Sequence, residues 1–131
     1  MSVFGTTINP SPTVVVKAAA ALADAPAYKA ITAGGAVAGA GAHALGIAIP
    51  MNDEPVPQGG DIHVQIKDIG TWKVGTITSG SEIAAGDELA SDANGCAIKA
   101  ASGKFIIGVA LEAATATGQI IPVHIRMAGY K

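Results

Sequence analysis

Two stretches of this sequence decide the fold: KAAAALADAPAYKAITAGGAV at residues 17–37 and ITSGSEIAAGDELASDANGCA at residues 77–97. They align at an offset of about 60 residues, better in the placing of turns and small residues than in identity. A duplication on this scale predicts a fold built from two similar β units. Features that both halves share are then architectural, so we expect function where the halves differ and at the ends of the chain.

The duplication continues beyond these stretches and gives approximate bounds for the two units. ALGIAI at residues 44–49 corresponds to IIGVAL at 106–111, and IHVQI at 62–66 corresponds to IPVHI at 121–125. The repeat units are therefore expected at about residues 17–66 and 77–125. We predict a single β domain over residues 13–131, preceded by an extended N-terminal arm at residues 1–12.

Short β-branched runs separated by turn residues predict an all-β fold. Thr13 to Val16 is a β-branched run that favours a strand, and further strands are expected at Thr71–Ile77, Glu88–Ser91, Cys96–Ala100, Lys104–Leu111 and Gln119–Met127. Turn signals recur about every 8–12 residues, a spacing typical of a sandwich or a small barrel. The fold class is thus a small β-barrel or sandwich made of two repeated β units.

The segment Ala18 to Ala25 leaves two alternatives open. Alanine has the best helix propensity, so local preference favours a helix. The corresponding segment in the second half contains Gly80 and leads into Gly86-Asp87, which favours a strand followed by a tight turn. The repeat therefore favours extended backbone here, against the local preference.

Composition excludes several classes of function. Only 14% of the 131 residues are charged and the net charge is −2, with no cluster of Lys and Arg, so binding to nucleic acid is not expected. No apolar run is long enough to cross a membrane, and the N-terminus does not resemble a signal peptide. The single cysteine cannot form an internal disulfide, which indicates synthesis in a reducing cytoplasm. A surface this poor in charge is typical of a protein that buries surface in an assembly.

No group of residues shows an enzymatic or metal-binding pattern. The histidines His43, His63 and His124 lack a metal-ligand spacing, and Cys96 has no base close to it in sequence apart from Lys99. The carboxylates Asp87, Glu88 and Asp92 are explained by turn capping. We therefore predict no catalytic residue, no metal and no cofactor.

Two features are candidates for contact with a partner. The arm carries apolar residues with little local core to join, and we expect it to order on a neighbouring molecule; its candidate contact residues are Val3, Phe4, Thr6, Ile8 and Pro10. Trp72, the only tryptophan, lies in the expected linker between the halves, Lys67 to Lys73. A lone large aromatic residue is either a core residue or an interface anchor, and both alternatives remain open.

Most of residues 13–125 resembles the capsid cement (decoration) proteins of tailed bacteriophages. The resemblance rests on IAAGDELASDANG at residues 83–95 with Ala97, on GVALEAA at 108–114, on GQIIPV at 118–123, and on the first-half stretches ITAGGAV at 31–37 and ALGIA at 44–48. It implies a structural protein on the outer surface of the virion, without catalysis, that stabilises the expanded shell by bridging major capsid subunits. It also implies a homotrimer and an arm that contacts the capsid or an adjacent copy. The alternative is a β-sandwich adhesion or glycan-binding module of a fibre or surface layer, which needs exposed aromatic residues for sugar stacking.

Overall fold

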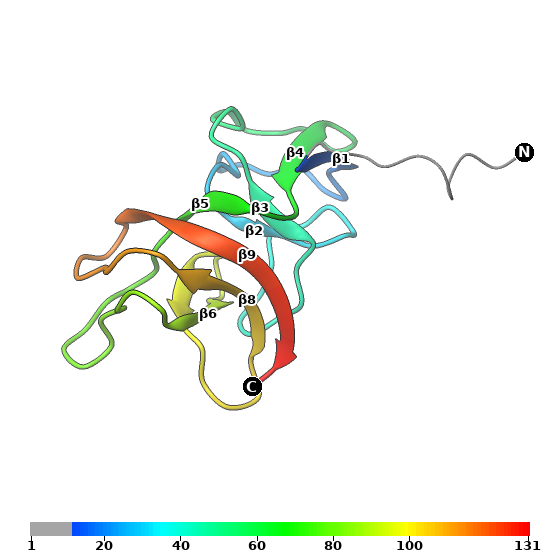
Figure 1. Ribbon diagram of the computed structural model, residues 1–131. Coiled ribbons are helices and arrows are strands. Elements are labelled where there is room, and N and C mark those ends of the chain that lie inside the picture. Colours follow the sequence, from blue (N-terminus) through cyan, green and yellow to red (C-terminus); the bar gives the residue numbers. More distant parts are fainter. Residues whose placement is uncertain (1–11) are drawn as a thin grey trace, which may run out of the picture.

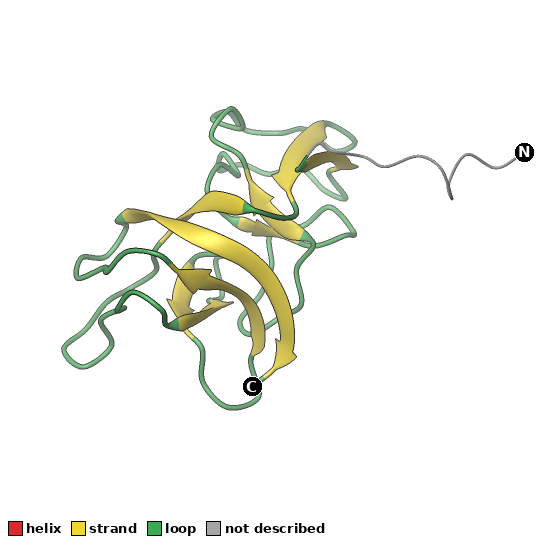
Figure 2. Ribbon diagram, viewed as in Figure 1, coloured by secondary structure: helices red, strands yellow, loops and turns green. Residues whose placement is uncertain are grey.

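The computed structural model describes residues 12–131, and within them the fold is all-β with no helix (Figures 1 and 2). This confirms the fold class predicted from the repeat. Nine strands form: β1 (Thr13–Lys17), β2 (Ala30–Ile31), β3 (Gly46–Ala48), β4 (Asp61–Gln65), β5 (Ile69–Lys73), β6 (Glu88–Ser91), β7 (Ala97–Lys99), β8 (Phe105–Ala110) and β9 (Ile120–Tyr130).

The strands make two antiparallel sheets that do not close into a barrel, so of the two alternatives the sandwich-like arrangement is correct. The first sheet has the order β1-β4-β3-β2 and the second the order β5-β9-β8-β6-β7. Figure 1 shows the first sheet at the top and the second below it, with the long β9 curving along the second sheet. We call residues 13–65, which supply the first sheet, the first unit, and residues 69–130 the second unit.

The two units share one strand topology. The order β1-β4-β3-β2 of the first sheet is repeated as β5-β9-β8-β6 in the second. The additional strand β7 pairs with β6, and its counterpart in the first unit is a single bridge between Ile31 and Val37. The halves that match in sequence therefore also match in hydrogen bonding.

The closest correspondence is a turn that follows β2 in one unit and β6 in the other. The Thr32 N–H donates to the Ala36 carbonyl (2.8 Å), and the Thr32 hydroxyl oxygen accepts from the Ala36 N–H (3.2 Å). The Asp92 N–H likewise donates to the Cys96 carbonyl (2.8 Å), and an Asp92 carboxylate oxygen accepts from the Cys96 N–H (2.9 Å). The capping role expected for the Asp92 side chain is thus confirmed.

A second pair of equivalent turns lies directly before β2 in the first unit and before β6 in the second. The Tyr28 N–H donates to the Ala48 carbonyl (3.0 Å), as the Gly86 N–H does to the Ala110 carbonyl (2.7 Å). Both residues have positive φ, 65° at Tyr28 and 92° at Gly86. Positive φ is common for glycine and strained for tyrosine. The two units therefore share this turn, although the first unit has tyrosine where the second has glycine.

The segment from Ala18 to Ala25 is not helical. Its backbone groups bond to residues far along the chain: the Ala18 N–H donates to the Gly60 carbonyl (2.8 Å), and Leu22 and Val56 exchange two bonds (2.7 and 3.0 Å). Helix propensity amounts to a few tenths of a kcal/mol per residue, so these non-local bonds outweigh it. The expectation of a linker over Lys67 to Lys73 also needs correction, since Ile69–Lys73 is strand β5 and only residues 66–68 connect the units.

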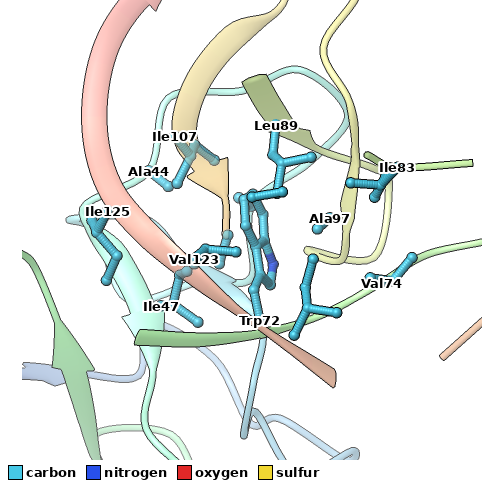
Figure 3. Close-up of a cluster of buried hydrophobic side chains, with 14 of the residues drawn as sticks. Ala44, Ile47, Trp72, Val74, Ile83, Leu89, Ala97, Ile107, Val123 and Ile125 are labelled. Carbon is cyan, nitrogen blue, oxygen red and sulfur yellow. The ribbon is translucent and has the colours of Figure 1, made fainter. Parts of the chain in front are cut away.

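The main core belongs mostly to the second unit and is completed by residues of the first, whereas the rest of the first unit has a separate core. The Trp72 side chain is fully buried (0% exposed) and packs among Ile47 of the first unit and Leu89 and Val123 of the second (Figure 3). Its Nε1–H donates to the Gly95 carbonyl (2.9 Å). Of the two alternatives for Trp72, burial selects the core residue, and the interface anchor is not retained because the indole is inaccessible to a partner.

Candidate interaction surfaces

The arm residues predicted to contact a partner, Val3, Phe4, Thr6, Ile8 and Pro10, lie outside the described residues. The point at which the arm joins the fold is described. The Ile66 N–H donates to the Pro12 carbonyl (2.8 Å), so the β1–β4 ladder extends to Pro12. The arm is thus attached at the N-terminal end of the edge strand of the first sheet.

The three histidines do not come together as a metal site. His63 and His124 lie on the corresponding strands β4 and β9, but not at the same position. His124 corresponds to Gln65, two residues after His63, and His63 corresponds to Pro122. His43 packs edge-on against Phe105, with ring centroids 4.5 Å apart. Among residues 12–131 no three His, Cys, Asp or Glu side chains are grouped to hold a metal ion, and no helix there could span a membrane.

Cys96 is buried at the end of the Asp92–Gly95 turn, directly before β7. Burial raises the pKa of its thiol, and the neighbouring Asp92 carboxylate raises this pKa further. A reactive thiol needs the opposite, an electropositive setting that lowers its pKa.

Because the thiolate is the nucleophile, we expect Cys96 to react with iodoacetamide more slowly at pH 8 in the folded protein than in the urea-unfolded chain. The folded-state pKa is raised, so the thiol stays protonated to higher pH and its contribution to stability is lost only as pH rises through that pKa. Mass spectrometry of quenched samples measures both rates. Equal rates in the two states would show that neither burial nor Asp92 protects the thiol.

The first unit covers the outer edge of β5, and this contact defines how the units associate. The Lys73 N–H donates to the Tyr28 carbonyl (3.0 Å), and the Gln65 side-chain amide donates to the Ile69 carbonyl (2.7 Å). A second contact is made by the 92–95 turn, where the Gly95 carbonyl accepts from the Ala30 N–H (2.8 Å) as well as from Trp72. The β5 edge of the second sheet is therefore covered by the first unit of the same chain.

The outer face of the second sheet exposes apolar side chains. Ile69 is 62% exposed and Leu111 45% exposed, and together with Asp68 and His124 they line a hollow of about 400 Å³. Ile120 is exposed nearby on β9. Exposed large apolar residues that cluster in this way mark surfaces for protein contacts.

Two of the three corresponding positions on the first sheet are polar, namely Thr13 for Ile69 and Asp61 for Ile120, whereas Ile49 corresponds to Leu111. Asp61 stands where the second unit has Ile120, and it forms an ion pair with Lys17 across β1 and β4. Lys17 lowers the pKa of the Asp61 carboxyl through this hydrogen-bonded contact. The two units thus share a backbone but differ in the character of their outer faces, and the sequence alone showed no signal for this difference because exposure depends on the sheet arrangement.

The acidic loop from Met51 to Gly60 is held by one buried polar side chain. The Asn52 amide donates to the carbonyls of Ile49 (2.9 Å) and His63 (2.7 Å), and its oxygen accepts from the His63 N–H (3.0 Å). Asp53 and Glu54 stay exposed on the loop. Asn52 is a structural residue that sequence reasoning missed.

Comparison with known proteins identifies the family. A model of the phage cement protein family matches residues 10–125, nearly the whole chain. The chain belongs to the phage cement protein family. This confirms the resemblance seen in the sequence, and as a cement protein the chain is a structural component of the phage head.

The fold of the cement protein is similar to that of a solved phage structure, the N base of the head fibre gp8.5 of bacteriophage phi29. The two have a TM-score of 0.59 and 20% sequence identity, and the match covers 91% of this chain and 97% of that chain. At this identity the likeness shows a shared fold. Among curated proteins, no sequence matches the cement protein significantly.

Proposed function

We propose that this protein binds the outer surface of the expanded phage capsid and stabilises the shell by bridging major capsid subunits, as a homotrimer without catalytic activity. The family match over residues 10–125 is the observation that carries the proposal. The proposed location is the virion surface, reached after synthesis in the host cytoplasm.

The surface of the described residues supports a role in assembly. The apolar side chains of Ile69, Leu111 and Ile120 are exposed in a chain with 14% charged residues. Exposed apolar side chains do not stabilise an isolated protein, but they stabilise a contact when a partner buries them. A capsid shell offers many identical binding sites, so a modest affinity at each site gives strong binding overall.

The N-terminal arm is proposed as one part of the contact. Val3, Phe4, Thr6, Ile8 and Pro10 would meet the capsid or an adjacent copy. The arm joins the fold at Pro12 on the edge of the first sheet, so it extends the reach of the molecule by up to about 36–40 Å for eleven residues.

The alternative, an adhesion or glycan-binding module, is not favoured by the structure. Sugar stacking needs exposed aromatic faces. Trp72 is fully buried, and Phe105 is buried with one edge-on contact to Tyr130, which leaves Tyr130 as the exposed ring of that pair.

The test is co-sedimentation of the purified protein with expanded heads that lack it. We expect saturable binding to expanded heads, with little binding to unexpanded heads. Deleting residues 2–11 keeps Pro12 and its bond to Ile66, so this variant is expected to fold but to bind expanded heads at least about tenfold more weakly, a loss of roughly 1.4 kcal/mol.

Two controls make this result specific. The free energy of unfolding of the deletion variant shows that the fold is intact, and Val15→Thr, a conservative change on the surface of the first sheet, should bind like the wild type. Full binding by the deletion variant would remove the arm from the proposal. Absence of binding to either kind of head by the complete protein would refute the cement role itself.

A further inference from the structure

Within one chain, a surface of the first unit covers the edge of strand β5 in the second unit. The equivalent surface of the second unit and the equivalent edge of the first unit are both uncovered within the described residues. In that contact the first unit presents Tyr28, Ile47 and Gln65, which we call the holding surface, to the outer edge of β5. Tyr28 accepts from the Lys73 N–H, Gln65 donates to Ile69, and Ile47 packs in the core around Trp72. Because the units share one fold, each part of this contact has an equivalent residue in the other unit.

Hydrogen bonds identify the equivalents of the holding surface in the second unit. Gly86 corresponds to Tyr28, since their N–H groups bond to the equivalent Ala110 and Ala48 carbonyls. The Ile125 N–H donates to the Asp68 carbonyl (2.9 Å), as the Ile66 N–H does to the Pro12 carbonyl, so Ile125 corresponds to Ile66. His124 and Gln65, the residues directly before them, therefore correspond to each other.

The third member of the equivalent surface follows from strand register. Val109 pairs with His124 as Ile47 pairs with Gln65. Gly86 and His124 are exposed and Val109 is half-buried, and the apolar hollow at Ile69 and Leu111 adjoins His124. The surface that would hold another unit is therefore present and uncovered within residues 12–131.

The equivalent of the held edge is β1. Along β1, the Pro12 carbonyl and the Ala18 N–H point towards β4, and backbone groups alternate with a period of two, so those of Val15 and Lys17 point away from the sheet. The described residues offer no hydrogen-bond partner to the Val15 N–H and carbonyl or to the Lys17 N–H. In β5 the N–H equivalent to that of Lys17 belongs to Lys73, and it is bonded to Tyr28.

The β1 edge also has the features of a strand that pairs. Its five residues, TVVVK, run in unbroken register with β4 and contain no proline and no bulge. Val15 is 53% exposed. Proteins usually blunt or cover an edge of this kind, since an open one invites pairing with another chain.

We propose that a second copy of this chain covers the β1 edge with its Gly86, Val109 and His124 surface, repeating between chains the contact that the first unit makes with β5 within one chain. The Gly86 carbonyl accepts from the Lys17 N–H of the neighbour. His124 lies where the first unit has Gln65, so its ring would contact the N-terminal end of the neighbour's β1. Each copy then gives one surface and receives another, a head-to-tail contact that closes into a ring if the rotation allows it.

This inference refines the self-association in the proposed function, and it names the surfaces that a trimer would use. It does not depend on the capsid contact. The experiments below use the free protein, so failure to bind heads and failure of this contact are separate results.

Disulfide trapping tests the contact directly. In a Cys96→Ala background we would make Lys17→Cys and Gly86→Cys as separate variants, because residues joined by a backbone hydrogen bond lie within the Cα separation that a disulfide spans. No atom lies within 4 Å of a Cβ built at Gly86, and although a side chain is strained at its φ of 92°, the equivalent turn accepts Tyr28 at a φ of 65°. We expect a two-chain product when the two variants are mixed and oxidised, and none from either alone.

The pattern of products decides between arrangements. A product from Lys17→Cys alone would mean that two β1 edges pair with each other, and it would overturn the proposal, as would the absence of any product in the mixture. Gly86→Cys mixed with Lys99→Cys, an exposed position on β7, is the matched control and should give no product.

A second variant tests the contact without cysteines. Lys17→Pro removes the N–H that the neighbour's Gly86 carbonyl would bind and leaves the β1–β4 ladder intact, because this N–H points away from β4 and proline is tolerated on an edge strand with its nitrogen towards solvent. We expect Lys17→Pro to sediment as a monomer at concentrations at which the wild type and Lys17→Ala, which loses the same side chain but keeps the N–H, associate. Unchanged association of Lys17→Pro would refute the proposed contact.

Discussion

Replacing Trp72 by alanine is expected to lower the free energy of unfolding by about 3–5 kcal/mol, the range for removing a large aromatic side chain from a packed core. The indole is fully buried and joins residues of both units, with Ile47 on one side and Leu89 and Val123 on the other. Its loss also leaves the Gly95 carbonyl without one of its two donors. Since a domain of this size has a total stability of about 5–15 kcal/mol, this loss is a large share of the total and should clearly lower the urea concentration at the midpoint of unfolding. Urea unfolding followed by far-UV circular dichroism measures the change.

The conservative variant Trp72→Phe separates packing from hydrogen bonding. It keeps an aromatic ring at the centre of the core and removes the Nε1–H donor, so we expect a smaller loss, of about 1–3 kcal/mol. If Trp72→Ala unfolded at the same urea concentration as the wild type, Trp72 would not be the core residue that joins the two units.

Gly46→Ala is expected to cost about 3 kcal/mol, the upper end of the range for overpacking. A Cβ built at Gly46 lies 2.0 Å from the Gln65 carbonyl oxygen and 2.8 Å from its carbon. These are backbone atoms of the neighbouring strand β4, so a side-chain rotation cannot relieve the contact, and β3 and β4 must separate. Gly108 is the corresponding residue of the second unit and lies 2.8 Å from the His124 carbonyl oxygen by the same measure. The repeat thus has glycine at two equivalent positions where a Cβ would meet the backbone of the neighbouring strand.

Gly39→Ala is the matched control. Gly39 has no positive φ, and no atom lies within 4 Å of a Cβ built there. Alanine restricts the unfolded chain without a clash, so Gly39→Ala should be neutral or should stabilise by up to about 1 kcal/mol. Thermal or urea unfolding compares the two variants, and an equal effect of both would show that close approach of β3 and β4 is not the reason for glycine at position 46.

Several parts of the structure could be predicted from the sequence because they depend on neighbours in the chain. The β-branched run from Thr13 gives β1, Glu88–Ser91 is β6 as expected, and the turn at Asp92 to Gly95 follows from an Asp cap and a glycine with positive φ. The duplication likewise predicted two units of one topology, since equivalent turns and small residues recur at a constant spacing.

Function was predicted through the same local patterns. The turn-and-strand pattern at residues 83–95 carried the resemblance to cement proteins that the family match confirms. The candidate contact residues of the arm stay a prediction, because they lie outside the described residues.

Other features could not be predicted from the sequence, because they depend on contacts between residues that are far apart in the chain. Alanine favours a helix from Ala18 to Ala25, but bonds to Gly60 and Val56 hold this segment extended. Trp72 has no local signal that distinguishes core from interface, and its burial comes from residues of both units that lie far away in the sequence, among them Ile47, Leu89 and Val123. The way the units pack covers the edge of β5 but leaves the backbone groups of Val15 and the Lys17 N–H on β1 without a partner among the described residues. A sequence records each unit's own hydrogen-bonding pattern, whereas which edge is covered depends on how two similar units pack, and that is set by contacts summed over the whole fold.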